Sequence, residues 1–203
     1  MAQQQVTYPV QFSIDYPDRP LNRMTSFFRI FTVIPIAIVL GLLGGKSGDY
    51  GIAAGGVLFG APLLMIVFRQ KYPRWWFDWN LAFMKFDARV NAYLSLMRDE
   101  YPSTDEEQAV HLEVPYPDVE RDLNRWLPLI KWFLAIPHFI VLLFLLIAAL
   151  IVVVIAWFAI LFTGRYPRDL FNFVEGTQRW AVRVVAYALL LVTDRYPPFR
   201  LNP

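Results

Sequence analysis

The sequence predicts an all-α membrane protein of two tandem repeats, each with a short strand, a transmembrane helical hairpin and an amphipathic interfacial helix. Of the 203 residues, 57% are hydrophobic and 18% are charged, whereas roughly a quarter of the residues in a soluble domain are charged. The same short motifs also occur twice in the same order. Together these two observations favour a duplicated chain in a lipid bilayer.

Four motifs occur in both halves of the chain with similar spacing. They are Tyr-Pro-Asp (16–18 and 116–118), Leu-Asn-Arg (21–23 and 123–125), Ile-Pro (34–35 and 136–137) and Tyr-Pro-Arg (72–74 and 166–168). Because their order never changes, we assign residues 1–102 to a first repeat and residues 103–203 to a second.

Each repeat contains enough apolar sequence for a membrane hairpin. In the first, the hairpin is predicted at about 25–68, where two apolar runs flank a glycine-rich turn and each can span a hydrocarbon core of roughly 30 Å. In the second, it is predicted at about 125–163 with a tight turn near 147–149. The alternative for 127–162 is an interfacial helix ending at Pro137, followed by a single span.

The distribution of positive charge favours two hairpins. With four spans, 18 of the 19 Lys and Arg residues lie on one side of the membrane and only Lys46 lies on the other. A single second span would place six arginines outside. Positive-inside bias therefore predicts a multi-pass protein with both termini in the cytoplasm.

Short strands and charged helices are predicted outside the spans. Apolar residues alternate with polar ones at 6–14 and 110–114, which is the period of a half-buried strand, and we hypothesise that these two strands pair. The stretch 74–98 is too charged to cross a bilayer comfortably, and an amphipathic helix in the headgroup layer suits its composition. The counterpart at 169–193 is more apolar, and it is predicted either to lie in the same interface or to pack under the hairpins.

Three runs in the second half resemble a known family. They are Ile-Pro-His-Phe-Ile-Val (136–141), Phe-Thr-Gly-Arg-Tyr-Pro-Arg (162–168) and Asp-Arg-Tyr-Pro-Pro-Phe (194–199). They resemble a bacterial membrane-protein family catalogued as domain of unknown function family 4389, and the first half looks like a diverged second copy. The resemblance implies a small multi-pass protein of the bacterial inner (cytoplasmic) membrane, and it supplies no activity or functional residue.

Two pairs of cations hold corresponding positions in the repeats. Arg29 and Lys131 lie just inside the first apolar stretch of each repeat, and Arg89 and Arg183 lie in the two charged helices. Cations in membrane segments are candidates for function, but a long side chain near a helix end can also reach the headgroups. We predict contact with lipid headgroups or with a partner for all four. For Arg89 and Arg183, an ion pair with Asp78, Asp87 or Glu175 is an equal alternative.

A stripe of small residues marks a predicted helix contact. Gly51, Gly55, Gly56 and Gly60 follow small-xxx-small spacing, which lets helix backbones approach closely in lipid. We predict that these glycines pack helices within the protein or between copies.

Little in the sequence indicates chemistry. Cysteine is absent, and the two histidines lack the spacing of a metal site. We therefore expect no enzyme activity, no catalytic residue, no metal and no cofactor. The net charge of +2 gives no reason to expect nucleic acid as a partner.

These features predict a non-catalytic integral membrane protein that serves as an accessory or scaffolding subunit of a membrane assembly. The expected partners are membrane lipids and either further copies of the chain in a homo-oligomer or other membrane protein subunits. The alternative is a small-solute or ion transporter or channel, because internal repeats often build a binding site at their interface.

Overall fold

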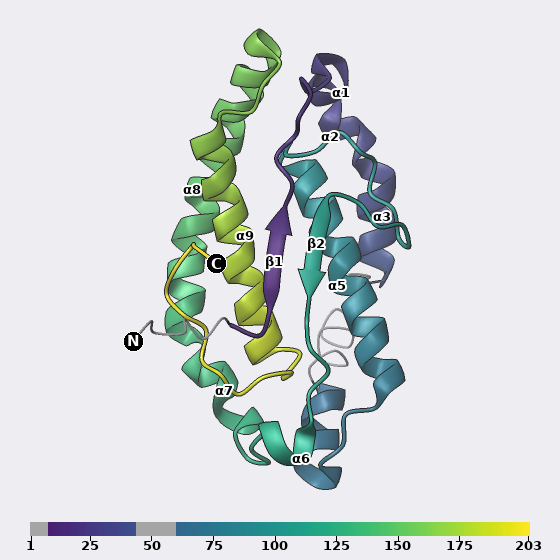
Figure 1. The fold of residues 1–203 in the computed structure, drawn as a ribbon, viewed down its shortest axis with the longest axis vertical. Helices are drawn as coiled ribbons and strands as arrows, with labels where there is room; N and C mark the ends of the chain where they lie inside the picture. Colours follow the sequence, from purple (N-terminus) through teal and green to yellow (C-terminus); the bar gives the residue numbers. More distant parts are fainter. Residues whose placement is uncertain (1–7, 44–59) are drawn as a thin grey trace, which may run out of the picture.

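The computed structural model describes residues 8–43 and 60–203. Strands β1 (Gln11–Ile14) and β2 (Val110–Glu113) form an antiparallel two-stranded sheet near the centre of an elongated molecule (Figure 1). Two 21-residue helices pack against this sheet: α9 (Arg168–Ala188) contacts β1, and α5 (Arg74–Leu94) contacts β2. The sheet therefore joins residues from the two halves of the chain.

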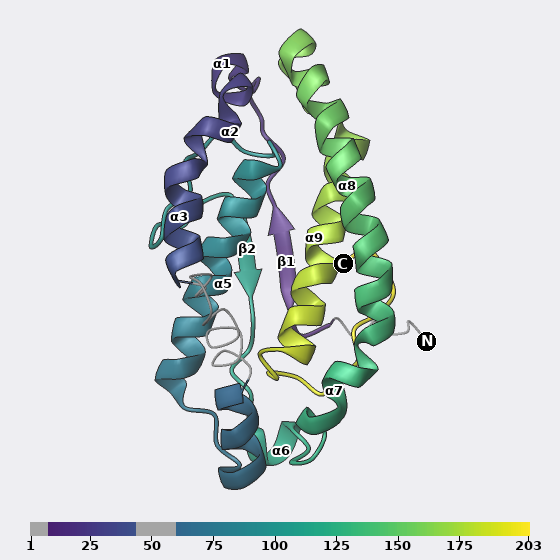
Figure 2. The same cartoon turned by 180° about the vertical axis from the view of Figure 1, so that it is seen from behind.

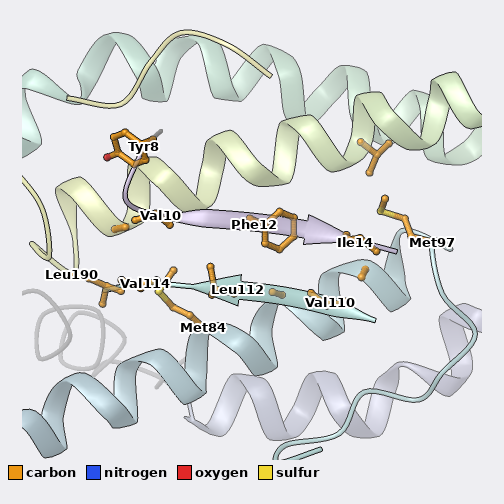
Figure 3. Packing of buried hydrophobic residues seen from close by; sticks show 14 of the residues in the cluster. Tyr8, Val10, Phe12, Ile14, Met84, Met97, Val110, Leu112, Val114 and Leu190 are labelled. Atoms are coloured by element: carbon orange, nitrogen blue, oxygen red, sulfur yellow. The ribbon is translucent and has the colours of Figure 1, made fainter. Parts of the chain in front are cut away.

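Alternation along the strands fixes the face that each side chain occupies. Phe12 lies opposite Leu112, and Ile14 lies opposite Val110. All four are buried and lie in the main core, whereas the intervening residues of both strands are polar and face outward. Figure 3 shows this row of apolar side chains together with Met84 and other core residues from outside the strands.

A second layer of helices lies outside α5 and α9. On the side of α5 it contains α2 (Arg29–Thr32) and α3 (Ile34–Leu43), and on the side of α9 it contains α7 (Pro128–Leu134) and α8 (Ile136–Thr163). The short helix α1 (Arg23–Phe27) precedes α2 and packs against α8. Seen from behind, α8 lies in front of α9 (Figure 2). The described elements also include the short helix α6 (Val119–Asp122) and the π-helical turn η2 (Met65–Arg69), which ends the apolar helix Gly60–Arg69.

Both ends of α8 follow from local sequence. Pro137 lies in its first turn, where the missing N–H leaves no helical bond unmade. At the other end, Gly164 adopts a left-handed conformation with φ of 74° and donates its N–H to the Ile160 carbonyl, as glycine commonly does after a helix. The 28 residues between these ends make a helix about 42 Å long.

The predicted fold class, an all-α protein of two tandem repeats with transmembrane hairpins, is wrong. The second hairpin does not exist, because α8 runs without a break through 147–149, where the turn was expected. No glycine, proline or charged residue occurs between Phe139 and Phe162 to stop the helix. The alternative, a short helix followed by one long helix, describes this segment, with the break at Ala135.

The first hairpin is not found either. Within residues 8–43 and 60–203, α8 is the one helix long and apolar enough to cross a membrane, while Arg29–Gly41 and Gly60–Arg69 are shorter apolar helices. The glycine-rich turn and most of the second apolar run lie outside the described residues. The hypothesis that the two strands pair is confirmed. Because one strand comes from each half of the chain, the two halves form a shared sheet and not two separate repeat units.

A proline at Ala148 tests the continuity of α8. Ala148→Pro removes one helical hydrogen bond and introduces a clash in the preceding turn, so we expect a loss of about 3 kcal/mol in unfolding free energy. Ala148→Gly is the matched control, with an expected loss of about 1 kcal/mol. Thermal unfolding in detergent, followed by circular dichroism, measures both. Equal melting temperatures for Ala148→Pro and the wild type would contradict an unbroken helix.

Candidate functional site

The outer layer exposes an unusually apolar surface, which we call the apolar outer face and define as the exposed side chains of α1–α3, α7 and α8. On α8 only a narrow stripe is buried, made by His138, Leu142, Ala149, Ala156 and Ile160. The other faces of this helix are open, with Phe144 66%, Leu150 65% and Phe162 78% exposed. An apolar patch that follows a whole helix is typical of a surface covered by protein or lipid.

Arg29 is buried beneath this face at 2% exposure. Its Nη2 lies 2.7 Å from Asp99 Oδ1, and its Nη1 donates to the carbonyl of Arg98 over 3.0 Å. The guanidinium carbon lies 3.9 Å from the centre of the Tyr93 ring, which adds a cation–π contact. The charge is thus held by the segment that follows α5.

Lys131 repeats this arrangement on the other side of the molecule. Its side chain is fully buried, its Nζ lies 2.7 Å from Asp194 Oδ1, and it donates to the Thr193 carbonyl over 2.8 Å. The Tyr187 ring centre lies 5.2 Å away. In both places the cation contacts the carboxylate, the carbonyl just before it and a tyrosine of the neighbouring long helix.

The two carboxylates also position the chain before the outer helices. The second oxygen of Asp99 accepts the N–H of Asn22 over 2.6 Å, and that of Asp194 accepts the N–H of Asn124 over 2.5 Å. We call these two sets the first anchor (Asn22, Arg29, Tyr93, Asp99) and the second anchor (Asn124, Lys131, Tyr187, Asp194). The first anchor joins the segment before α1 to the segment after α5, and the second anchor joins the segment before α7 to the segment after α9.

Sequence reasoning missed the two carboxylates as partners of the cations. The signal was present, since an aspartate stands two residues before a Tyr-Pro pair at Asp99 and again at Asp194. Spacing alone did not show that each aspartate lies against the cation of the same half. The structure places Arg29 and Lys131 against protein atoms, and their contact with lipid headgroups or a partner stays a prediction.

Burial and pairing act on Lys131 in opposite directions. Burial lowers the pKa of its ammonium group below the usual value, and the Asp194 carboxylate counteracts part of this effect. The direction of the pKa shift shows that desolvation is the larger of the two. The second anchor therefore depends strongly on the negative charge of Asp194.

Arg89 and Arg183, the other predicted contact residues, are buried as well. Arg89 donates to the Ser103 carbonyl over 2.9 Å, and Arg183 donates to the Asn202 carbonyl over 3.1 Å. Burial and the nearby Arg179 and Arg200 lower the pKa of Arg183. Both arginines hold segments that follow the long helices, and the structure does not bring either of them together with Arg29 or Lys131.

The glycine stripe can be placed only in part. Gly51, Gly55 and Gly56 lie outside the described residues, so their helix packing stays a prediction. At Gly60, a methyl group in place of the hydrogen would have no heavy atom of the described chain within 4 Å. Close packing at Gly60 would thus need a surface other than the described part of this chain.

One groove of the described residues is lined mainly by apolar side chains. This groove of about 430 Å³ lies between α5 and α9; Asp87 is the one carboxylate in its lining, which contains neither histidine nor lysine. His138 is buried and accepts a hydrogen bond from Trp180 Nε1 over 3.0 Å. No group of three or more potential metal-binding side chains occurs within residues 8–43 and 60–203.

Two further contacts cross between the halves of the chain. The Arg168 guanidinium lies 4.4 Å from the ring centre of Tyr16, and the Arg74 guanidinium lies 5.0 Å from that of Tyr116. The hydroxyl of Tyr16 donates to the Tyr166 carbonyl, and the hydroxyl of Tyr116 donates to the Tyr72 carbonyl. Each Tyr-Pro-Asp motif therefore contacts the Tyr-Pro-Arg motif of the other half.

Loss of the carboxylate should destabilise the second anchor. Asp194→Asn leaves the Lys131 ammonium buried without a negative partner, so we expect a loss of about 3 kcal/mol or more in unfolding free energy. Asp118→Asn, which breaks an exposed pair with Arg121, should cost less than about 1 kcal/mol. Adding Lys131→Met to Asp194→Asn should restore most of the melting temperature. A double variant no more stable than Asp194→Asn would contradict this account.

The comparisons with known proteins give one match. The family model described as Domain of unknown function (DUF4389) matches residues 126–200 as a single copy. Among curated proteins and among solved structures, the comparisons found no match. The matched segment contains α7, α8, α9 and the Lys131–Asp194 pair. Residues 126–200 are therefore the part of the chain that is similar to the DUF4389 family.

Proposed function

We propose that this chain is a non-catalytic protein of the bacterial inner membrane and that it serves as an accessory or scaffolding subunit of a membrane assembly. The observation that carries the proposal is the apolar outer face together with the burial of Arg29 and Lys131 beneath it. Water is a poor solvent for such a surface, whereas lipid tails and apolar helices of other subunits suit it equally.

The length of α8 supports insertion into a bilayer. At about 42 Å the helix exceeds a hydrocarbon core of roughly 30 Å. Its window of highest hydropathy is only 17% buried inside the protein. A core helix of a soluble protein is mostly buried, so the exposure of α8 favours lipid contact over an interior role.

The two anchors support the same proposal because they neutralise buried cations within the protein. Arg29 and Lys131 lie buried beneath the outer helices, and each contacts a protein carboxylate. Because both charges are neutralised within the protein, neither needs water at the apolar outer face. The exposed residues of α8 carry no charge at all, which suits a surface in contact with lipid.

The apolar character of α8 weighs against the alternative of a transporter or channel. A transporter needs polar groups along its route. On the buried stripe of α8, His138 is the one polar side chain, and its Nδ1 is occupied by Trp180. The buried stripe of α8 therefore offers little to a passing solute, and the proposal stays with a scaffolding role.

A charge on the apolar outer face tests membrane insertion. Leu150 is exposed near the middle of α8, and an arginine at the centre of a membrane helix costs about 2.5–3.5 kcal/mol of insertion free energy. Leu150→Arg should therefore lower the amount of chain recovered in salt-washed membranes. Glu113→Arg, on the outward face of the sheet, should leave that amount unchanged. Insertion would be contradicted if the salt wash released the wild type into the soluble fraction to the same extent as a folded Leu150→Arg protein.

Purification in a mild detergent tests the scaffolding role. We expect the full chain to co-purify with a stoichiometric membrane partner or as a homo-oligomer of defined mass, because the open faces of α8 offer a long contact surface. Size-exclusion chromatography with light scattering measures the mass. A stable monomer without a partner, obtained from membranes at native expression level, would contradict the scaffolding role without touching membrane insertion.

A further inference from the structure

A cationic hollow lies beside the connection from α8 to α9. This connection is towards the upper end of Figure 1. The hollow has a volume of about 310 Å³ and forms between residues 16–21, which follow β1, and residues 165–168, which connect α8 to α9. We call it the upper hollow. Its lining includes Arg19, Arg165 and Arg168, with Asp18 as the one carboxylate.

The walls of the upper hollow are fixed by hydrogen bonds. Leu21 donates its N–H to the Gly164 carbonyl over 2.8 Å, and the Tyr16 hydroxyl donates to the Tyr166 carbonyl. Gly164 itself lies in the left-handed conformation that ends α8. The two segments are therefore held side by side, and the hollow does not depend on a loose loop.

The three arginines have no negative partner of their own. Within residues 8–43 and 60–203, none of them forms an ion pair. Arg168 lies over the Tyr16 ring, and this contact holds its guanidinium in place without using its N–H groups. Three unpaired guanidinium groups around one hollow create a site that attracts an anion.

The corresponding hollow at the opposite end serves as an internal comparison. It lies between residues 70–74 and 116–120 and has a volume of about 680 Å³. Its lining has two cations, Lys71 and Arg74, and two carboxylates, Asp118 and Glu120. This lower hollow is therefore electrically balanced, although its tyrosine hydrogen bond and its arginine–tyrosine contact match those of the upper one.

We propose that the upper hollow binds a phosphate group, carried by an anionic lipid headgroup or by free phosphate. Guanidinium groups match phosphate oxygens with two parallel hydrogen bonds each, which makes arginine the residue of choice for this anion. Gly164 places the hollow next to the last turn of α8. Headgroup phosphate as the source rests on the proposed membrane insertion of α8, whereas phosphate binding in itself does not.

The test uses the full chain purified in a nonionic detergent, titrated with phosphatidylglycerol and, separately, with inorganic phosphate. Bound phosphatidylglycerol is measured by native mass spectrometry, and phosphate binding is measured by calorimetry. We expect Arg19→Gln, Arg165→Gln and Arg168→Gln together to weaken binding about a hundredfold, at about fivefold per cation. The matched control combines Lys71→Gln with Arg74→Gln in the lower hollow and should change binding by less than about twofold.

Because Arg168 contacts Tyr16, the triple variant can lose stability. The double variant Arg19→Gln with Arg165→Gln keeps that contact and alters only exposed side chains, and we expect it to weaken binding about twentyfold. Its melting temperature should equal that of the wild type. This variant separates loss of the site from loss of the fold.

The two probes distinguish the source of the phosphate. Binding of phosphatidylglycerol without binding of inorganic phosphate, lost in the variants, supports a lipid headgroup site. Inorganic phosphate that binds and displaces phosphatidylglycerol supports a site for the free anion. Equal binding by the wild type and the double variant, or no binding of either probe by the wild type, overturns the proposal. The two outcomes that overturn the proposal do not depend on whether α8 crosses a bilayer. The Leu150→Arg experiment tests that question separately.

Discussion

The neutralisation of two buried cations is the constraint on which the rest of the structure depends. An unpaired charge in an apolar interior costs several kcal/mol, so Arg29 and Lys131 can lie beneath the outer helices only while Asp99 and Asp194 face them. The carboxylates come from the segments that follow α5 and α9. Docking of the outer layer is therefore linked to the ends of the inner helices, and neither layer reaches its position independently of the other.

This link explains how one molecule combines a charged chain with an apolar surface. The charges needed to position the layers are turned inward, and the exposed side of α8 is left to Phe144, Leu150 and Phe162. The buried stripe of α8 has small residues, Ala149 and Ala156, and α8 packs against both α9 and α1. Small side chains allow close approach of neighbouring helices, so shape rather than charge holds α8 along its length.

Part of this fold could be predicted from the sequence. Alternating residues marked both strands, and the charged stretches marked α5 and α9, because these patterns are local. The second hairpin was a wrong prediction because positive-inside bias was given more weight than the lack of any helix-breaking residue after Phe139. The partners of Arg29 and Lys131 were missed for another reason. A sequence shows how far apart two residues lie along the chain, but only the docked helices bring Asp99 and Asp194 to 2.7 Å from the cations.

The recurring motifs now have a physical explanation that does not require a membrane hairpin in each half. Tyr16 contacts Arg168, and Tyr116 contacts Arg74, so each Tyr-Pro-Asp motif meets the Tyr-Pro-Arg motif of the opposite half. The same pairing is needed at both ends of the sheet, and equal contacts require equal residues. Positions outside these contacts are free to differ. Arg19 in the upper hollow and Glu120 in the lower hollow are two such positions. Shared motifs thus specify the framework, and the residues between them give the two ends different charge.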